Sequence, residues 1–169
     1  MHATRSRRLP IYSICFATLC GVVLLIFFLN RGIATGQSNY DSRSAVMLAF
    51  VQRTNDLRAK NNLPALTPSQ QLEQSAIAKL QDMQQSQYWG HYSPSGQSFS
   101  RFIWQYDEDA ELVGENLARC FETYDAAFAA LVNSPLHYKV LTGDFTNIGV
   151  ASQKTASGCE SIVMHVSRT

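Results

Sequence analysis

The sequence predicts a chain of the α+β class, with its helices first and its strands last. Apolar residues recur at helical spacing between Val46 and Met83. Near the C-terminus they alternate with their neighbours instead, so that Ile162, Met164 and Val166 share one face of a predicted strand. The 169 residues, 46% of them hydrophobic and 16% charged, suit one globular domain with an appendage.

The appendage is the N-terminal segment, where Ile11–Leu29 form an apolar run without a charge. A run of roughly 20 apolar residues is long enough to cross a bilayer. Arginines precede it and only Arg31 closely follows, so we expect a cytoplasmic N-terminus and an exported domain. A cleaved signal peptide is the alternative, because Gly32–Ala34 offers small residues at a cleavage site, and the domain would then be secreted.

These observations divide the chain into a basic cytoplasmic leader (1–10), a transmembrane signal anchor (11–30), a linker (31–43) and one domain (44–169). The net charge of +1 leaves no basic face of the kind a phosphate backbone requires, which argues against nucleic acid as a partner. Cys120 and Cys159 are the two cysteines of the exported part, and export permits a disulfide between them. Two separately buried thiols are the alternative.

The first half of the domain is predicted to be helical. One helix starts near Ser44 and ends at 61–64, where Asn-Asn-Leu-Pro interrupts the pattern. A second is expected to start with Thr67 as its cap and Pro68 at its first position. The buried face of this second helix is predicted to comprise Leu72, Ala76, Leu80 and Met83.

A loop at 88–96 is followed by a short helix and an acidic connection at 107–111. The pattern then favours a helix beginning near Gly114, another over 123–133, and a short one opened by Ser134 and Pro135. Strands are expected at 147–151 and 160–167.

In the predicted exported domain, Glu115 lies between two histidines, His91 and His137, in the order of the sequence. Glu115 follows a glycine at a predicted helix start, where the helix dipole favours a carboxylate and Asn116 could cap the same turn. His137 falls in the first turn of a predicted helix, where the dipole disfavours the imidazolium. Such a set can bind a divalent metal such as zinc with an open position.

Ser134 is not expected to act as a nucleophile, and His165 is not expected to join the three candidates. Ser134 precedes His137, but helix capping explains it and no G-x-S-x-G nucleophile motif is present in the sequence. His165 lies on a predicted strand and is left out of the candidate set.

Several short motifs occur in an order typical of one family. They are Asn55–Arg58, Leu63–Leu66, His91–Gly96, Arg101, Gly114–Ala118, Asn133–His137 and Phe145–Val150. In this combination the chain resembles the bacterial branch of the CAP superfamily, also called SCP-like extracellular domains. The resemblance implies an α-β-α sandwich with a central antiparallel sheet.

The resemblance also implies a cleft in which family members gather two histidines and two acidic residues, sometimes around a divalent metal. His91, Glu115 and His137 match three of the four, with Arg101, Asn116 and Ser134 as supporting residues. No acidic residue stands where the second glutamate occurs in eukaryotic members, which weakens transfer of a four-residue metal site.

Three functions are compatible with this pattern. The leading hypothesis is an envelope module that binds a lipid, cell-wall or protein ligand through the cleft. The alternative is a metal-assisted hydrolase of peptide or cell-wall polymer, with Glu115 as general base and His91 and His137 as metal ligands. The third is a buried polar network that only stabilises the fold.

Overall fold

The computed structural model describes residues 45–155 and 158–169 of the chain. The chain divides into two units, Met1–Asp41 and Ser42–Thr169, and every element described below belongs to the second. The predicted leader, anchor and linker, and the Ser44 cap, lie outside the described residues. Among the residues that are described, no helix is both long and apolar enough to cross a bilayer.

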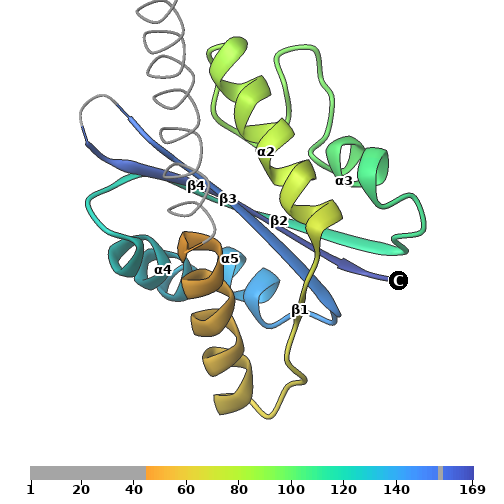
Figure 1. The fold of residues 1–169 in the computed structure, drawn as a ribbon, viewed down its shortest axis with the longest axis vertical. Coiled ribbons are helices and arrows are strands. Elements are labelled where there is room, and N and C mark those ends of the chain that lie inside the picture. The colour runs from red at the N-terminus through yellow and green to blue at the C-terminus, as the bar shows by residue number, and fades with distance from the viewer. Residues whose placement is uncertain (1–44, 156–157) are drawn as a thin grey trace, which may run out of the picture. The chain divides into compact units, whose positions relative to one another are not determined.

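A four-stranded sheet forms the centre of this unit (Figure 1). Its strands are β1 (Thr67–Pro68), β2 (Leu112–Phe121), β3 (Asn147–Lys154) and β4 (Glu160–Arg168), in the order β1-β3-β4-β2. Strand β4 pairs antiparallel with both β2 and β3, whereas β1 pairs parallel with β3. The expectation of an antiparallel sheet is therefore wrong at one edge, and the sheet is mixed.

Helices cover both faces of the sheet. The described part of the chain has a helix at 45–60, α2 (Gln70–Gln85), α3 (Ser100–Tyr106), α4 (Tyr124–Asn133) and α5 (Pro135–Leu141). In Figure 1, α2 and α3 lie on one side of the strands, and helix 45–60, α4 and α5 lie on the other. The α+β class is confirmed.

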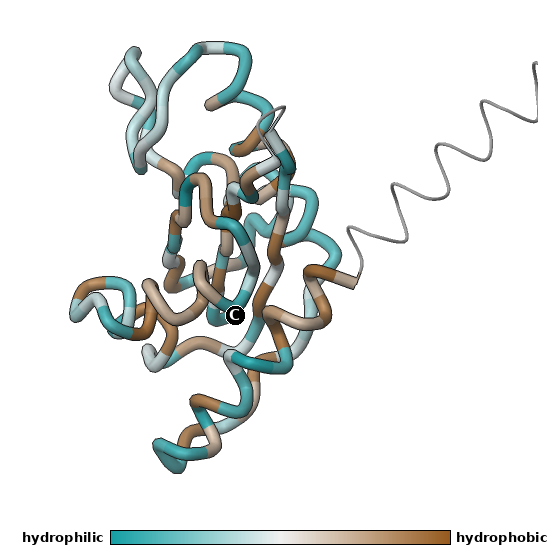
Figure 2. Tube along the Cα trace, turned by 90° about the vertical axis from the view of Figure 1, so that its left-hand side faces the viewer, coloured by the Kyte–Doolittle hydropathy of each residue, from teal (hydrophilic) through white to brown (hydrophobic). Residues whose placement is uncertain are grey.

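Alternation along the strands builds a hydrophobic core on each face. Met164 of β4 belongs to the cluster formed with helix 45–60, α4 and α5, whereas its neighbour Val163 packs with Leu80 of α2. Brown and teal residues alternate along the helices in Figure 2, as expected where one helix face is buried. The predicted stripe of α2 is confirmed, since Leu72, Ala76, Leu80 and Met83 are all buried.

The predicted start of the second helix is wrong, because the predicted cap and first residue belong to a strand. Thr67 and Pro68 are extended and form β1, and Ser69 is the N-cap of α2, its Oγ accepting a hydrogen bond from the Leu72 amide. A proline is tolerated in an edge strand such as β1, because its missing N–H need not pair. Ser69 and Thr67 are both good caps, and pairing of Thr67 with Asn147 decides between them.

The helix predicted near Gly114 is also wrong, because that segment is strand β2. Val113 and Leu117 lie four residues apart, which is a helical spacing, but Leu112–Ala118 pair residue by residue with β4. Sheet pairing therefore overrides the local pattern. The helices predicted at 123–133 and after Ser134, and the two C-terminal strands, are confirmed.

The predicted disulfide between Cys120 and Cys159 is confirmed. It links the end of β2 to the start of β4 across 39 residues of sequence. The pairing register of β2 with β4 shifts between Ala118 and Phe121, and Cys120 has a φ of 58° within this bulge. The bridge thus fixes the two strands at the point where their regular pairing is interrupted.

Candidate functional site

Strand β2 presents two adjacent polar residues to opposite layers of the domain. Glu115 and Asn116 are both buried, at 4% and 1% exposure. Successive residues of a strand face opposite sides, so Glu115 points toward the α2 layer and Asn116 toward α5. There the Asn116 amide donates a hydrogen bond to the main-chain oxygen of His137, 3.1 Å away.

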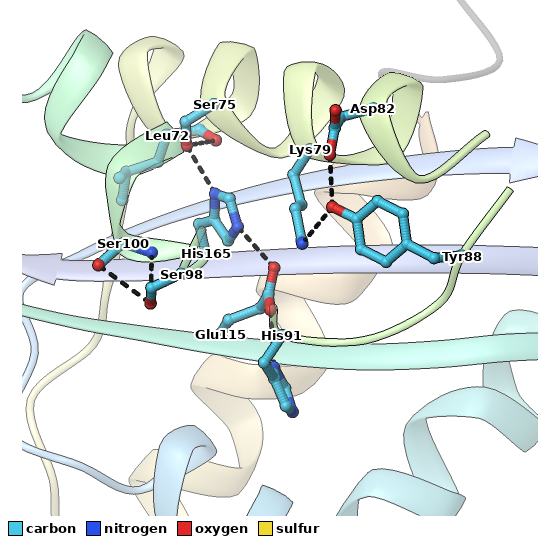
Figure 3. A network of polar contacts seen from close by, with 10 residues as sticks. All are labelled: Leu72, Ser75, Lys79, Asp82, Tyr88, His91, Ser98, Ser100, Glu115 and His165. Atoms are coloured by element: carbon cyan, nitrogen blue, oxygen red, sulfur yellow. Dashed lines mark hydrogen bonds and ion pairs between the residues drawn. The ribbon is translucent and has the colours of Figure 1, made fainter. Parts of the chain in front are cut away.

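The carboxylate of Glu115 is held between two imidazoles (Figure 3). Its Oε1 lies 2.7 Å from Nδ1 of His91, and its Oε2 lies 3.0 Å from Nε2 of His165. The side chains of Glu115 and His165 are fully buried, whereas that of His91 is 44% exposed. A carboxylate can only accept hydrogen bonds, so the Nδ1–H of His91 donates a hydrogen bond to Glu115. Nε2 of His91 takes no part in this contact.

His165 is the residue that the sequence argument left out. It lies directly opposite Glu115 in the register of β2 with β4, and opposite Gly149 in the register of β3 with β4. Its second ring nitrogen, Nδ1, lies 2.7 Å from Oγ of Ser75 on α2. The network therefore runs from α2 through two strands to the loop that carries His91.

A second group of polar residues lies beside this network on α2 (Figure 3). The buried Lys79 donates a hydrogen bond to the hydroxyl of Tyr88, 2.9 Å away, and that hydroxyl donates to Asp82. The Lys79 ammonium also lies 4.7 Å from the ring centroid of Tyr88 and 5.3 Å from that of Phe102. Ser75, Lys79 and Asp82 follow one another at spacings of four and three, which places them on one side of α2.

Opposite charges and hydrogen bonds keep Glu115 ionised in this buried position. Burial raises the pKa of Glu115, but hydrogen bonds from His165 and His91 and the charges of His165 and Lys79 outweigh it, and the net pKa is lowered. Burial lowers the pKa of His165 despite its carboxylate partner. Burial also lowers the pKa of Lys79, against the opposing charges of Glu115 and Asp82.

A groove of about 490 Å³ opens beside His91. Its walls come from the His91 loop and Phe99, the start of β2, α5 and the turn after α5. Its apolar lining residues are Phe99, Leu112, Val113, Val140 and Phe145, and Glu115, Lys139 and Asp144 are its charged ones. The ring of Phe99 packs against both histidines, with its centroid 6.0 Å from that of His91 and 6.3 Å from that of His165.

Arg58 of helix 45–60 holds the turn that forms one wall of this groove. Its buried guanidinium donates hydrogen bonds to the main-chain oxygens of Leu141, Gly143 and Phe145 at 3.1, 2.8 and 3.3 Å. Three carbonyls bound by one planar group leave the turn little freedom. The arginine of the Asn55–Arg58 motif therefore shapes the groove without lining it.

The remaining candidates lie around this centre. His137 is half-buried on α5, and burial and the charge of His91 lower its pKa. Ser134 occupies the N-cap position of α5, but its side chain makes no capping hydrogen bond, contrary to the expectation. Arg101 is exposed on α3 and does not line the groove.

Metal binding requires several ligands that converge on one point. Across residues 45–155 and 158–169, no three His, Cys, Asp or Glu side chains are gathered in a way that could hold a metal ion. Both oxygens of Glu115 already accept hydrogen bonds from imidazoles. Metal binding by His91 and His137 together stays a prediction, which elemental analysis of the purified chain can test.

The lowered pKa of His137 predicts how its contribution to stability depends on pH. Its folded pKa lies below the ordinary value of 6.5, so the unfolded chain binds the proton more readily. Stability from this residue is therefore present above pH 6.5 and is lost as the pH falls. We expect the unfolding free energy of the wild type relative to His137→Gln to decrease between about pH 7.5 and 5.5. Urea unfolding at several pH values measures it, and a constant or rising difference contradicts it.

Comparison with known proteins identifies the family. The model of the cysteine-rich secretory protein family, CAP, matches residues 51–166. The uncharacterised protein YkwD of Bacillus subtilis is 34% identical over 124 residues, which are 73% of this chain and 48% of YkwD. The chain thus spans about half the length of this relative.

Two solved structures share the fold. An extracellular protein of Bacillus anthracis that contains an SCP domain superposes with a TM-score of 0.68 at 27% identity, covering 75% of this chain and 41% of that one. An outer surface protein of Borrelia burgdorferi superposes with a TM-score of 0.67 at 25% identity, covering 73% of this chain and 92% of that one. The chain belongs to the cysteine-rich secretory protein (CAP) family and carries an SCP-like domain.

Proposed function

We propose that the protein is an envelope module that binds an amphipathic ligand, such as a fatty acid, in the groove beside His91. The observation that carries the proposal is the orientation of His91. Its Nδ1 is fixed by the buried Glu115 while its side chain is 44% exposed at a groove with mostly apolar walls. Pockets of about 300–1,000 Å³ with a few oriented polar groups are typical of small-molecule sites, and this groove falls in that range.

The lining suits a ligand with an apolar body and a polar head. The apolar part of the ligand would pack against Val113, Val140 and Phe145. Its polar group would form a hydrogen bond with the ring nitrogen of His91. Lys139, which is exposed and also lines the groove, favours an acidic head, because the carboxylate of Asp144 on the same lining is ion-paired with Arg168. The extracellular and outer-surface relatives support a location in the cell envelope, held there by the predicted N-terminal anchor.

The structure gives the hydrolase hypothesis no support. A general base must reach the proton that it removes, yet the Glu115 side chain is fully buried and both of its oxygens are hydrogen-bonded. Glu115 is better described as a positioning residue for His91.

Binding of laurate to the full chain tests this proposal, with calorimetry as the measurement. Val140→Asp places a charge on the groove wall and should weaken binding at least about tenfold, because burying a carboxylate beside an alkyl chain costs more than 1.4 kcal/mol. Leu136→Asp is the matched control, since Leu136 lies on the same helix, is 75% exposed and does not line the groove. Absence of binding, or equal loss in both variants, contradicts the proposal.

A further inference from the structure

A second cavity, of about 510 Å³, lies at the C-terminal end of α2 and shares no lining residue with the His91 groove. Residues of strands β2 and β3 form the side of the cavity opposite α2. Arg119 of β2 and Gln153 of β3 belong to the same strand faces as Leu117 and Ala151, which pack under α2. Gln153 donates a hydrogen bond to Gln84 of α2, 3.1 Å away.

Two aromatic rings, of Tyr88 and Trp89, form part of the wall of this cavity. The Tyr88 hydroxyl is bound by Lys79 and Asp82, which fixes the direction of the ring. Trp89 packs against the hydrophobic cluster under α2 and is only half-buried. Both rings are therefore in place before a ligand arrives, which lowers the entropic cost of binding.

Arg119 gives the cavity a positively charged side chain. It is exposed, its guanidinium carbon lies 5.7 Å from the Trp89 ring centroid, and the bulge and disulfide at Cys120 fix the strand next to it. Lys154 also lines the cavity, and no Asp or Glu is among the lining residues that the structure describes. A planar guanidinium held near an aromatic ring is well suited to bind a carboxylate through two hydrogen bonds.

From this combination we infer a second ligand site, beyond the proposed function, for a carboxylated saccharide. The exposed part of the Trp89 indole packs against the apolar C–H face of a pyranose ring, and Arg119 beside it pairs with the carboxylate. The amides of Gln84, Gln87 and Gln153 can both donate to and accept from sugar hydroxyls. An uncharged sugar engages the ring and the amides but leaves the guanidinium without its partner.

The test compares two N-acetylated disaccharides, the second being N,N′-diacetylchitobiose (chitobiose below), that differ in one lactyl ether, which bears the carboxylate. N-acetylglucosaminyl-N-acetylmuramic acid carries it, and chitobiose lacks it. The indole N–H signals of the full chain are followed by NMR during each titration. Trp104 is an internal reference, because it lies on α3, donates to the Ala110 carbonyl and does not line the cavity.

We expect the Trp89 signal to shift with the carboxylated disaccharide and the Trp104 signal to stay. Arg119→Gln should weaken this binding at least about fivefold, and chitobiose should bind the wild type at least about fivefold more weakly. Lys60→Gln is the matched control, because it removes an exposed charge that lies outside the cavity, and it should bind as the wild type does. No Trp89 shift, equal affinity for the two sugars, or full affinity in Arg119→Gln overturns the inference.

Discussion

Replacing Glu115 with glutamine should lower the free energy of unfolding by about 3–5 kcal/mol. The change keeps the shape of the side chain but removes the negative charge that faces the buried Lys79. It also turns one hydrogen-bond acceptor into an NH₂ donor, which then faces an N–H of His91 or His165. Urea unfolding of the full chain, monitored by circular dichroism, measures this loss.

Glu111→Gln is the control for that experiment. Glu111 is exposed just before β2, and its ion-pair distance to Arg168 is 3.9 Å, so its loss should cost less than about 0.5 kcal/mol. If Glu115→Gln were as mild as Glu111→Gln, the carboxylate would not be the centre of the buried network.

Replacing Gly149 with alanine should destabilise the domain by about 3 kcal/mol. A Cβ at this position would lie 2.2 Å from main-chain atoms of Leu72 and of Glu73 in α2. Main-chain atoms cannot rotate away, so α2 has to move off the sheet. Because Gly149 is directly opposite His165, the same movement should lengthen the contact between His165 and Ser75.

Gly90→Ala gives the comparison for this substitution. The nearest atom to a Cβ at Gly90 is 3.9 Å away, which is ordinary contact, so a change within about 0.5 kcal/mol is expected. Thermal unfolding of both variants beside the wild type measures the difference. A Gly149→Ala variant as stable as Gly90→Ala would show that α2 does not pack against β3 at the distance described.

The parts of the fold that the sequence predicts well are those with a strong local signal. The stripe of α2 and the alternation of β4 are of this kind, because each repeats over several turns or residues. Strand β2 lacks such a signal, since its residues are buried on both faces and no simple alternation results. Thr67 and Pro68 are misassigned for a related reason, because their strand consists of two residues and depends on pairing with β3.

The sequence predicts only those residues of the candidate site that have a local signal. His91 and Glu115 stand out as polar residues in a loop and beside a glycine, and the structure brings them within 2.7 Å. His165 sits in an apolar strand 50 residues from Glu115, and only the pairing register makes the two neighbours. Ser75 and Lys79 resemble the solvated positions of an amphipathic helix until the opposing strand is known.

Glu115 fixes His91 with Nδ1 protonated and leaves Nε2 open to a ligand. The nitrogen-15 shifts of the His91 ring, recorded by NMR on the full chain at pH 8, test it most directly. We expect the tautomer with a proton on Nδ1 in the wild type, because an ionised Glu115 can only accept a hydrogen bond. A ring that carries its proton on Nε2, or one that exchanges freely between the two tautomers, would contradict it.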